Sequence, residues 1–224
     1  MRSMREKPAG SSSSALRVLL VDDHKVLRRG LRGVIEEEFP GTHFGEAEDS
    51  QSALELIYNE TWDLVLLDVN IPGRNGFDVL QEVKQLSPST PVLVVSAYPE
   101  EDFAVRALKL RAAGYLTKCR VADELNPAIK KALTGGRYVT ASLAEKLAAS
   151  LGEDVKGARH ESLSNREFQV LRLVALGRSL KELSAELLLS EKTVGTYRRR
   201  ISEKMGISSN VELARYALQA GLVD

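Results

Sequence analysis

The chain has 224 residues, of which 43% are hydrophobic and 28% are charged, and its 31 basic and 31 acidic side chains give zero formal net charge. This composition is ordinary for a soluble protein that buries a core. No apolar run approaches the roughly 18 residues that a membrane-spanning helix needs, so no membrane contact is expected. The single cysteine, Cys119, excludes an internal disulfide and favours a reducing, cytoplasmic location.

The charges and polar residues are unevenly distributed along the chain. Residues 1–14 are basic and serine-rich with no apolar segment after them, which predicts a disordered leader rather than a signal peptide. Residues 15–134 hold 14 Lys and Arg against 19 Asp and Glu, whereas residues 160–224 hold 10 against 8. A small basic end on an acidic body is a weak indication of nucleic-acid binding.

The first half of the chain alternates short apolar runs with helical patterns. Strands are predicted near 16–21, 43–47, 63–68, 91–96 and 114–118, and helices near 24–39, 50–60, 75–86, 99–111 and 121–134. Five such units favour a flavodoxin-like, doubly wound parallel α/β sheet with strand order 2-1-3-4-5. Gly135 and Gly136 end the pattern, so a linker with one helix is predicted over 135–160.

Polar residues stand where the predicted strands end. In an open parallel sheet the carboxyl ends of the strands share one edge, so these side chains should converge. A single Asp after a strand is often only a helix cap or a turn former. The coincidence at several strand ends instead favours a divalent-metal and phosphoryl site with Asp68 as the acceptor; the residues are Asp22, Asp23, Asp68, Ser96 and Lys118.

The motifs around these positions resemble a two-component receiver domain over about half of the chain. They are Val21-Asp22-Asp23-His24, Leu67-Asp68-Val69-Asn70-Ile71-Pro72-Gly73, Val95-Ser96-Ala97 and Gly114-Tyr115-Leu116-Thr117-Lys118. The resemblance implies that Asp68 accepts a phosphoryl group from a sensor histidine kinase while Lys118 neutralises the developing charge. It also implies a Mg²⁺ site and a conformational switch; the metal ligands would be Asp22, Asp23, Asp68 and the main-chain carbonyl of Asn70, and the switch residues Ser96 and Tyr115.

Two details qualify this resemblance. A phosphatase of the haloacid dehalogenase type also uses an Asp nucleophile but requires a second Asp two residues later, where this chain has Asn70. A self-modifying acceptor rather than an enzyme with a separate substrate is therefore expected. Cys119 stands where many receivers have proline after the lysine, so a trans Lys118–Cys119 peptide bond is predicted, since a non-proline cis bond costs about 3 kcal/mol.

After Glu161 the pattern is entirely helical. Capping boxes of the S-x-x-E type are predicted at Ser164, Ser179 and Ser209, and Ser190 is a further N-cap. Gly177 and Gly206 stand where helices should end. These signals predict four helices near 165–176, 180–187, 191–205 and 210–220, and the short link between the second and third favours a helix-turn-helix.

The third of these helices is amphipathic. Val194, Ile201 and Met205 fall on one side, and polar groups suited to phosphates and base edges fall opposite. An amphipathic surface helix without a ligand is the alternative. The predicted DNA-binding residues are Lys192, Thr193, Thr196, Arg199, Arg200 and Lys204.

The motifs Leu163-Ser164-Asn165-Arg166-Glu167, Ser190-Glu191-Lys192-Thr193-Val194 and Lys204-Met205-Gly206 resemble the LuxR-type helix-turn-helix. With residues 15–134 as the receiver and 161–224 as the DNA-binding domain, the whole chain is similar to NarL/FixJ response regulators. The resemblance implies phosphorylation-gated binding of promoter DNA as a homodimer, with a sensor kinase and RNA polymerase as partners.

The last helix, which has apolar positions such as Val211 and Leu218, is the expected dimer contact. The chain departs from the family at Leu180, Gly195 and Tyr197, which leaves the DNA sequence preference open. Two rival functions also remain: a factor that binds DNA regardless of phosphorylation, and a receiver whose helical tail binds only protein.

Overall fold

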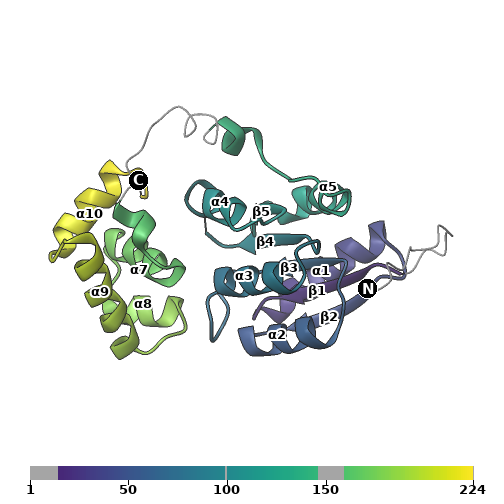
Figure 1. Cartoon of the computed structure of the whole chain (residues 1–224), viewed down its shortest axis with the longest axis horizontal. Helices are drawn as coiled ribbons and strands as arrows, with labels where there is room; N and C mark the ends of the chain where they lie inside the picture. The colour runs from purple at the N-terminus through teal and green to yellow at the C-terminus, as the bar shows by residue number, and fades with distance from the viewer. Residues whose placement is uncertain (1–14, 99, 146–158, 224) are drawn as a thin grey trace, which may run out of the picture.

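The computed structural model describes residues 15–98, 100–145 and 159–223. The chain forms an α/β domain and a smaller helical domain beside it (Figure 1). The predicted leader and much of the predicted linker helix lie outside the described residues, although residues 141–145 are helical. Among the residues described, no helix is long and apolar enough to span a bilayer.

The N-terminal domain is a five-stranded sheet in which every neighbouring pair of strands is parallel, with the order β2-β1-β3-β4-β5 that the sequence predicts. Its strands are β1 (Arg17–Val21), β2 (His43–Ala47), β3 (Leu64–Leu67), β4 (Val92–Ser96) and β5 (Gly114–Thr117). Its helices are α1 (Lys25–Glu38), α2 (Ser50–Asn59), α3 (Gly76–Leu86), α4 (Glu100–Lys109) and α5 (Val121–Leu133).

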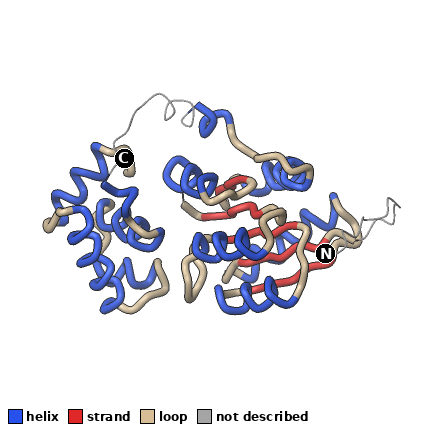
Figure 2. The backbone as a smooth tube through the Cα atoms, in the orientation of Figure 1, coloured by secondary structure: helices blue, strands red, loops and turns tan. Residues whose placement is uncertain are grey.

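Helices cover both faces of this sheet (Figure 2). Because successive strand residues point to opposite faces, Val18 and Leu20 of β1 pack with α1 and α5, whereas Leu19 and Val21 pack with α2, α3 and α4. Both sets are buried. The sheet is therefore fixed from two sides, and the loops at its carboxyl edge are held at defined positions.

Over residues 159–223 the C-terminal domain forms the four predicted helices, α7 (Asn165–Ala175), α8 (Leu180–Glu186), α9 (Glu191–Met205) and α10 (Asn210–Gln219). They are preceded by a short 3-10 helix that the sequence did not predict, η1 (Arg159–Ser162). The capping boxes at Ser164 and Ser179 are confirmed. Ser190 caps α9 through the amide of Thr193. Ser209 accepts a hydrogen bond from the amide of Val211, one position earlier than the predicted box requires, so it acts as a simple cap.

Helices α8 and α9 form the predicted helix-turn-helix. The inward side of α9 is confirmed, because Val194, Ile201 and Met205 are all buried. Gly206 ends α9 with a φ of 66°, a left-handed conformation that glycine adopts without the strain a Cβ atom would impose. Since the apolar side of α9 packs inward, its polar side lies at the surface.

The two domains contact each other through α7 on one side and α3 and α4 on the other (Figure 1). Phe103 of α4 packs edge-on against Phe168 of α7, with ring centroids 5.5 Å apart. Arg106 lies over the same Phe168 ring and donates a 2.6 Å hydrogen bond to the carbonyl of Leu163. Asn75 donates to Gln169 at 2.8 Å. This interface combines aromatic packing with buried hydrogen bonds.

Candidate functional site

Charged side chains meet at the carboxyl edge of the sheet. Asp22 follows β1, Asp68 follows β3, and each is only 2% exposed. Lys118, which follows β5, places its Nζ atom 2.7 Å from Asp22 Oδ2 and 2.7 Å from Asp68 Oδ2. Three residues that are far apart in the sequence therefore form one compact ionic cluster.

Backbone contacts hold Asp68 in place. Its amide donates to the carbonyl of Val21 at 2.8 Å, which continues the pairing of β1 with β3, and its Oδ1 accepts from the amide of Asn70 at 2.9 Å. Gly76, the first residue of α3, lies against the same segment. A Cβ atom there would come within 2.4 Å of the Asp68 carbonyl oxygen, so only glycine allows α3 to begin this close.

Burial and the neighbouring charges act in opposition in this cluster. Burial raises the pKa of the Asp68 carboxyl above its ordinary value, although the Lys118 ammonium acts to lower it. Burial alone would lower the pKa of Lys118, but Asp68 and Asp22 hold it above its ordinary value. The lysine is therefore a permanent cation at this edge of the sheet.

Side chains that could hold a metal ion lie together at the same place. Asp22, Asp23, His24 and Asp68 each offer one ligand atom, and these atoms lie within 4.8 Å of one another. His24 is the member that the sequence did not single out; its Nδ1 lies 2.7 Å from Asp23 Oδ1 and 3.1 Å from Asp22 Oδ1. Since the cluster is mainly carboxylate oxygen, it fits a hard divalent cation.

Asn70 and the two switch residues have defined contacts. The side chain of Asn70 donates a 2.9 Å hydrogen bond to the carbonyl of Glu186 at the end of α8, so it reaches the other domain. Ser96 is buried at the end of β4, and its hydroxyl accepts from the amide of Tyr98. Tyr115 is only 1% exposed and donates to the carbonyl of Tyr98 at 2.9 Å, so its ring already occupies an inward position.

The predicted DNA-binding residues divide into two groups. Lys192, Arg199 and Arg200 are exposed on the outward side of α9, and Thr196 is half-buried there, with its hydroxyl donating to the carbonyl of Lys192. Thr193 instead belongs to the cap of α9, since its amide donates to the hydroxyl of Ser190. Lys204 pairs with the buried carboxylate of Glu167 at 2.6 Å, which ties α9 to α7.

Two family models match this chain. A response regulator receiver domain matches residues 18–130, and the luxR family of bacterial regulatory proteins matches residues 161–217. The response regulator GacA of Pseudomonas aeruginosa is 35% identical over 210 residues, which cover 93% of this chain and 98% of the relative. The chain belongs to the NarL/FixJ family of response regulators. The response regulator UvrY of Escherichia coli is also similar, with 32% identity covering 92% of this chain and 95% of that protein.

Solved structures agree with the fold of this response regulator. A LuxR-family two-component response regulator from Aurantimonas sp. has 33% identity and a TM-score of 0.56, covering 62% of this chain and 100% of that one. RcsB of Salmonella enterica serovar Typhimurium, bound to the promoter rprA with the phosphomimetic BeF3-, gives a TM-score of 0.58 at 24% identity. That match covers 90% of this chain and 98% of RcsB, and it supports the fold alone.

Apart from Asn70, sequence reasoning missed the residues that join the two domains. Arg106 and Asn165 bond to each other, and Asn165 also donates to Asp78 at 3.3 Å. In the sequence, Asn165 stood out only as the first residue of a helix and as part of the LuxR-type motif, not as a contact between domains. A signal was nevertheless present, because α4 carries the aromatic Phe103 and the cationic Arg106 on neighbouring turns of one side.

Proposed function

We propose that this response regulator accepts a phosphoryl group on Asp68 from the histidine of a sensor kinase, and that this modification controls its binding to promoter DNA as a dimer. The observation that carries the proposal is the position of Lys118, whose ammonium lies 2.7 Å from both Asp22 and Asp68. A cation at that point neutralises charge on the oxygens of a phosphoryl group attached to Asp68.

Each residue of the cluster has a part in the transfer. A carboxylate oxygen of Asp68 forms the new bond to phosphorus while the phosphorus–nitrogen bond to the kinase histidine breaks. Asp22, Asp23, Asp68 and the main-chain carbonyl of Asn70 would hold Mg²⁺, which would supply further positive charge for the phosphoryl oxygens. Lys118 moves from pairing with Asp68 to pairing with the phosphoryl group, and its permanent charge requires no proton transfer.

The signal passes from Asp68 to the rest of the receiver through Ser96. The new phosphoryl oxygens accept a hydrogen bond from the Ser96 hydroxyl, which in the present structure accepts from the amide of Tyr98. The main-chain carbonyl of Tyr98 also accepts a hydrogen bond from the hydroxyl of Tyr115. Movement of Ser96 therefore shifts the loop after β4 and the hydrogen bond to Tyr115 together.

The output is DNA binding by the outward side of α9, with RNA polymerase as the eventual partner. Lys192, Thr196 and Arg199 lie on that side, where a recognition helix meets the major groove. A dimer is supported by α10, because the side chains of Val211 and Leu218 are exposed there although both are apolar. Two copies would read two half-sites, which a single helix-turn-helix cannot do.

Treatment of the full chain with acetyl phosphate and Mg²⁺ tests this proposal. Intact-mass measurement should show one added phosphate on the wild type and none on Asp68→Asn. Asp63→Asn, an acidic residue outside the cluster, is the matched control and should be labelled like the wild type. Equal labelling of Asp68→Asn and the wild type would contradict the assignment of Asp68. DNA captured equally by phosphorylated and unphosphorylated protein would instead support the phosphorylation-independent alternative.

A further inference from the structure

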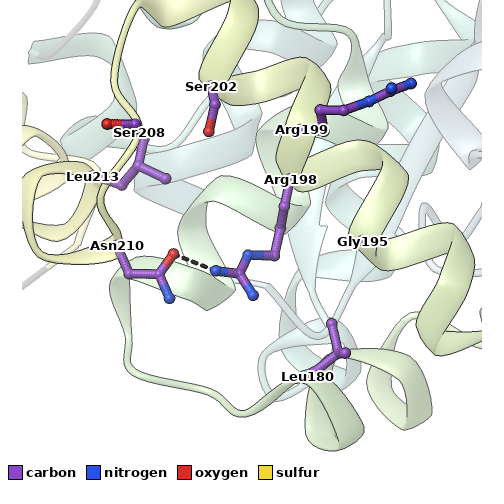
Figure 3. Close-up of a pocket in the computed structure, with 8 residues that line it drawn as sticks. All are labelled: Leu180, Gly195, Arg198, Arg199, Ser202, Ser208, Asn210 and Leu213. Carbon is purple, nitrogen blue, oxygen red and sulfur yellow. Dashed lines mark hydrogen bonds between the residues drawn. The ribbon is translucent and has the colours of Figure 1, made fainter.

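A hollow of about 270 Å³ lies beside α9, next to the side that we propose contacts DNA. It is bounded by the start of α8, the middle of α9 and the start of α10, and the residues that line it are Leu180, Gly195, Arg198, Arg199, Ser202, Ser208, Asn210 and Leu213 (Figure 3). Gly195 forms part of the α9 wall, and a Cβ atom built on it would meet no other atom within 4 Å. The missing side chain therefore leaves this wall open.

The two arginines of the wall point in different directions. Arg198 extends across the hollow toward Asn210, and its Nη2 donates a 2.5 Å hydrogen bond to Asn210 Oδ1, whereas Arg199 extends away from the hollow (Figure 3). This bond uses one corner of the guanidinium fork and leaves other N–H donors of the same group for a ligand. None of the eight lining residues is acidic, so the hollow is suited to an anion.

The position of the hollow indicates that the anion it binds is a phosphate of the DNA backbone. In a helix-turn-helix the second helix lies in the major groove while the first crosses the sugar–phosphate backbone. Leu180 is the first residue of α8, the first helix of this motif, and it is one of the residues that line the hollow. A DNA strand that passed the start of α8 in this way would run over the hollow and over Arg198.

We infer that Arg198 binds a backbone phosphate of the DNA in this hollow, which makes it a contact for any DNA sequence, while Arg199 faces the base edges. This inference rests on the proposed function, because it adds a residue to the DNA-binding surface that the sequence pattern did not include. Phosphate contacts set the position of a protein on the duplex but carry no sequence information, whereas base contacts specify. The adjacent arginines of α9 would thus have separate roles.

Binding of the phosphorylated full chain to two DNA duplexes over a salt series tests the inference. One duplex is selected by the wild-type protein from a random pool, and the other has the same composition in scrambled order. Arg198→Gln should weaken binding to both duplexes by a similar factor, about three- to tenfold, and reduce the slope of log affinity against log salt by about 0.9. A neutral methylphosphonate at one phosphate of each half-site should weaken the wild type but not Arg198→Gln.

Asn210→Ala is the matched control, because it breaks the hydrogen bond of Arg198 but leaves its charge. This variant should keep the wild-type salt slope. If Asn210→Ala reproduces Arg198→Gln, the arginine only ties α9 to α10 and the inference is wrong. An unchanged slope in Arg198→Gln, or a loss confined to the selected duplex, overturns it as well. If the wild type binds neither duplex, the proposed DNA-binding function fails instead.

Discussion

The edge of the receiver sheet holds its charged groups in a closed cluster, whereas α9 of the DNA-binding domain presents its charged groups to solvent. Asp22 and Asp68 are 2% exposed and already paired with Lys118, while the side chain of Arg199 is 73% exposed. A phosphoryl group that enters the first site must therefore displace an existing ion pair. DNA bound at α9 as proposed would displace mainly water and counterions, so its binding would depend strongly on salt.

The largest effect is expected at Gly76, which is closely packed against Asp68, and not at Gly30, which lies on the open surface of the same domain. Gly76→Ala would place a Cβ atom 2.4 Å from the Asp68 carbonyl oxygen, so the start of α3 must shift. We expect a loss of about 3 kcal/mol in the free energy of unfolding, measured with urea, together with slower phosphorylation by acetyl phosphate. Gly30→Ala, whose Cβ would meet nothing within 4 Å, is the control and should not destabilise the protein. Equal stability of the two variants would show that the loop after β3 is not tightly packed.

The contact between the two domains is tested next, through Arg106. Arg106→Ala removes the hydrogen bonds to Leu163 and Asn165 and the stacking over Phe168. We expect a loss of about 2 kcal/mol of coupling between the domains, so that one calorimetric unfolding transition becomes two. Arg120→Ala removes an exposed arginine from the same domain and should leave a single transition. A single transition in Arg106→Ala as well would mean that this arginine does not couple the domains.

Lys204 pairs with a carboxylate of another helix, whereas Lys192 and Arg199 of α9, which we propose as DNA contacts, are exposed to solvent. Hydrogen bonds from Lys204 and Ser164 keep the pKa of the Glu167 carboxyl below its ordinary value of 4.5, even though burial acts to raise it. The carboxylate therefore stabilises the fold above about pH 4.5, and this contribution is lost as the pH falls through the lowered pKa. Lys204→Met should cost about 1–2 kcal/mol of unfolding free energy at pH 7, and the difference from the wild type should shrink in acid.

The control for Lys204 is Lys192→Met, which removes an exposed cation from the same helix. It should leave the unfolding free energy within about 0.5 kcal/mol of the wild type across the pH range. A Lys204→Met variant that is as stable as Lys192→Met at pH 7 would contradict the structural role of Lys204.

The smallest expected effect is a gain in stability at Gly195. Its Cβ position is open and its backbone is helical, so Gly195→Ala should raise the free energy of unfolding by about 0.5–1 kcal/mol. Gly206→Ala is the opposite case, because its φ of 66° disfavours a Cβ atom, and it should lose about 1 kcal/mol. Thermal unfolding of both variants would reveal changes of opposite sign; changes of the same sign would contradict this account of α9.

The sequence by itself determined the fold class, the order of the strands and the placement of Asp22, Asp68, Ser96 and Lys118 at one edge of the sheet. These features follow from local rules. Hydrophobic period separates strands from helices, and parallel crossovers bring the carboxyl ends of the strands together. The ends of α7, α8 and α9 were also predictable, since a serine cap or a terminal glycine acts on backbone groups only a few residues away.

Only the tertiary structure decided which partner each charged or polar side chain has. Lys204 matched the pattern of a DNA contact, and only the structure shows that its ammonium also pairs with Glu167 of another helix at 2.6 Å. His24 lies beside the carboxylates of Asp22 and Asp23, and Arg106 contacts α7, more than fifty positions away in the chain. Such contacts depend on how two folded surfaces meet, and side-chain periodicity within one helix carries no information about the surface opposite.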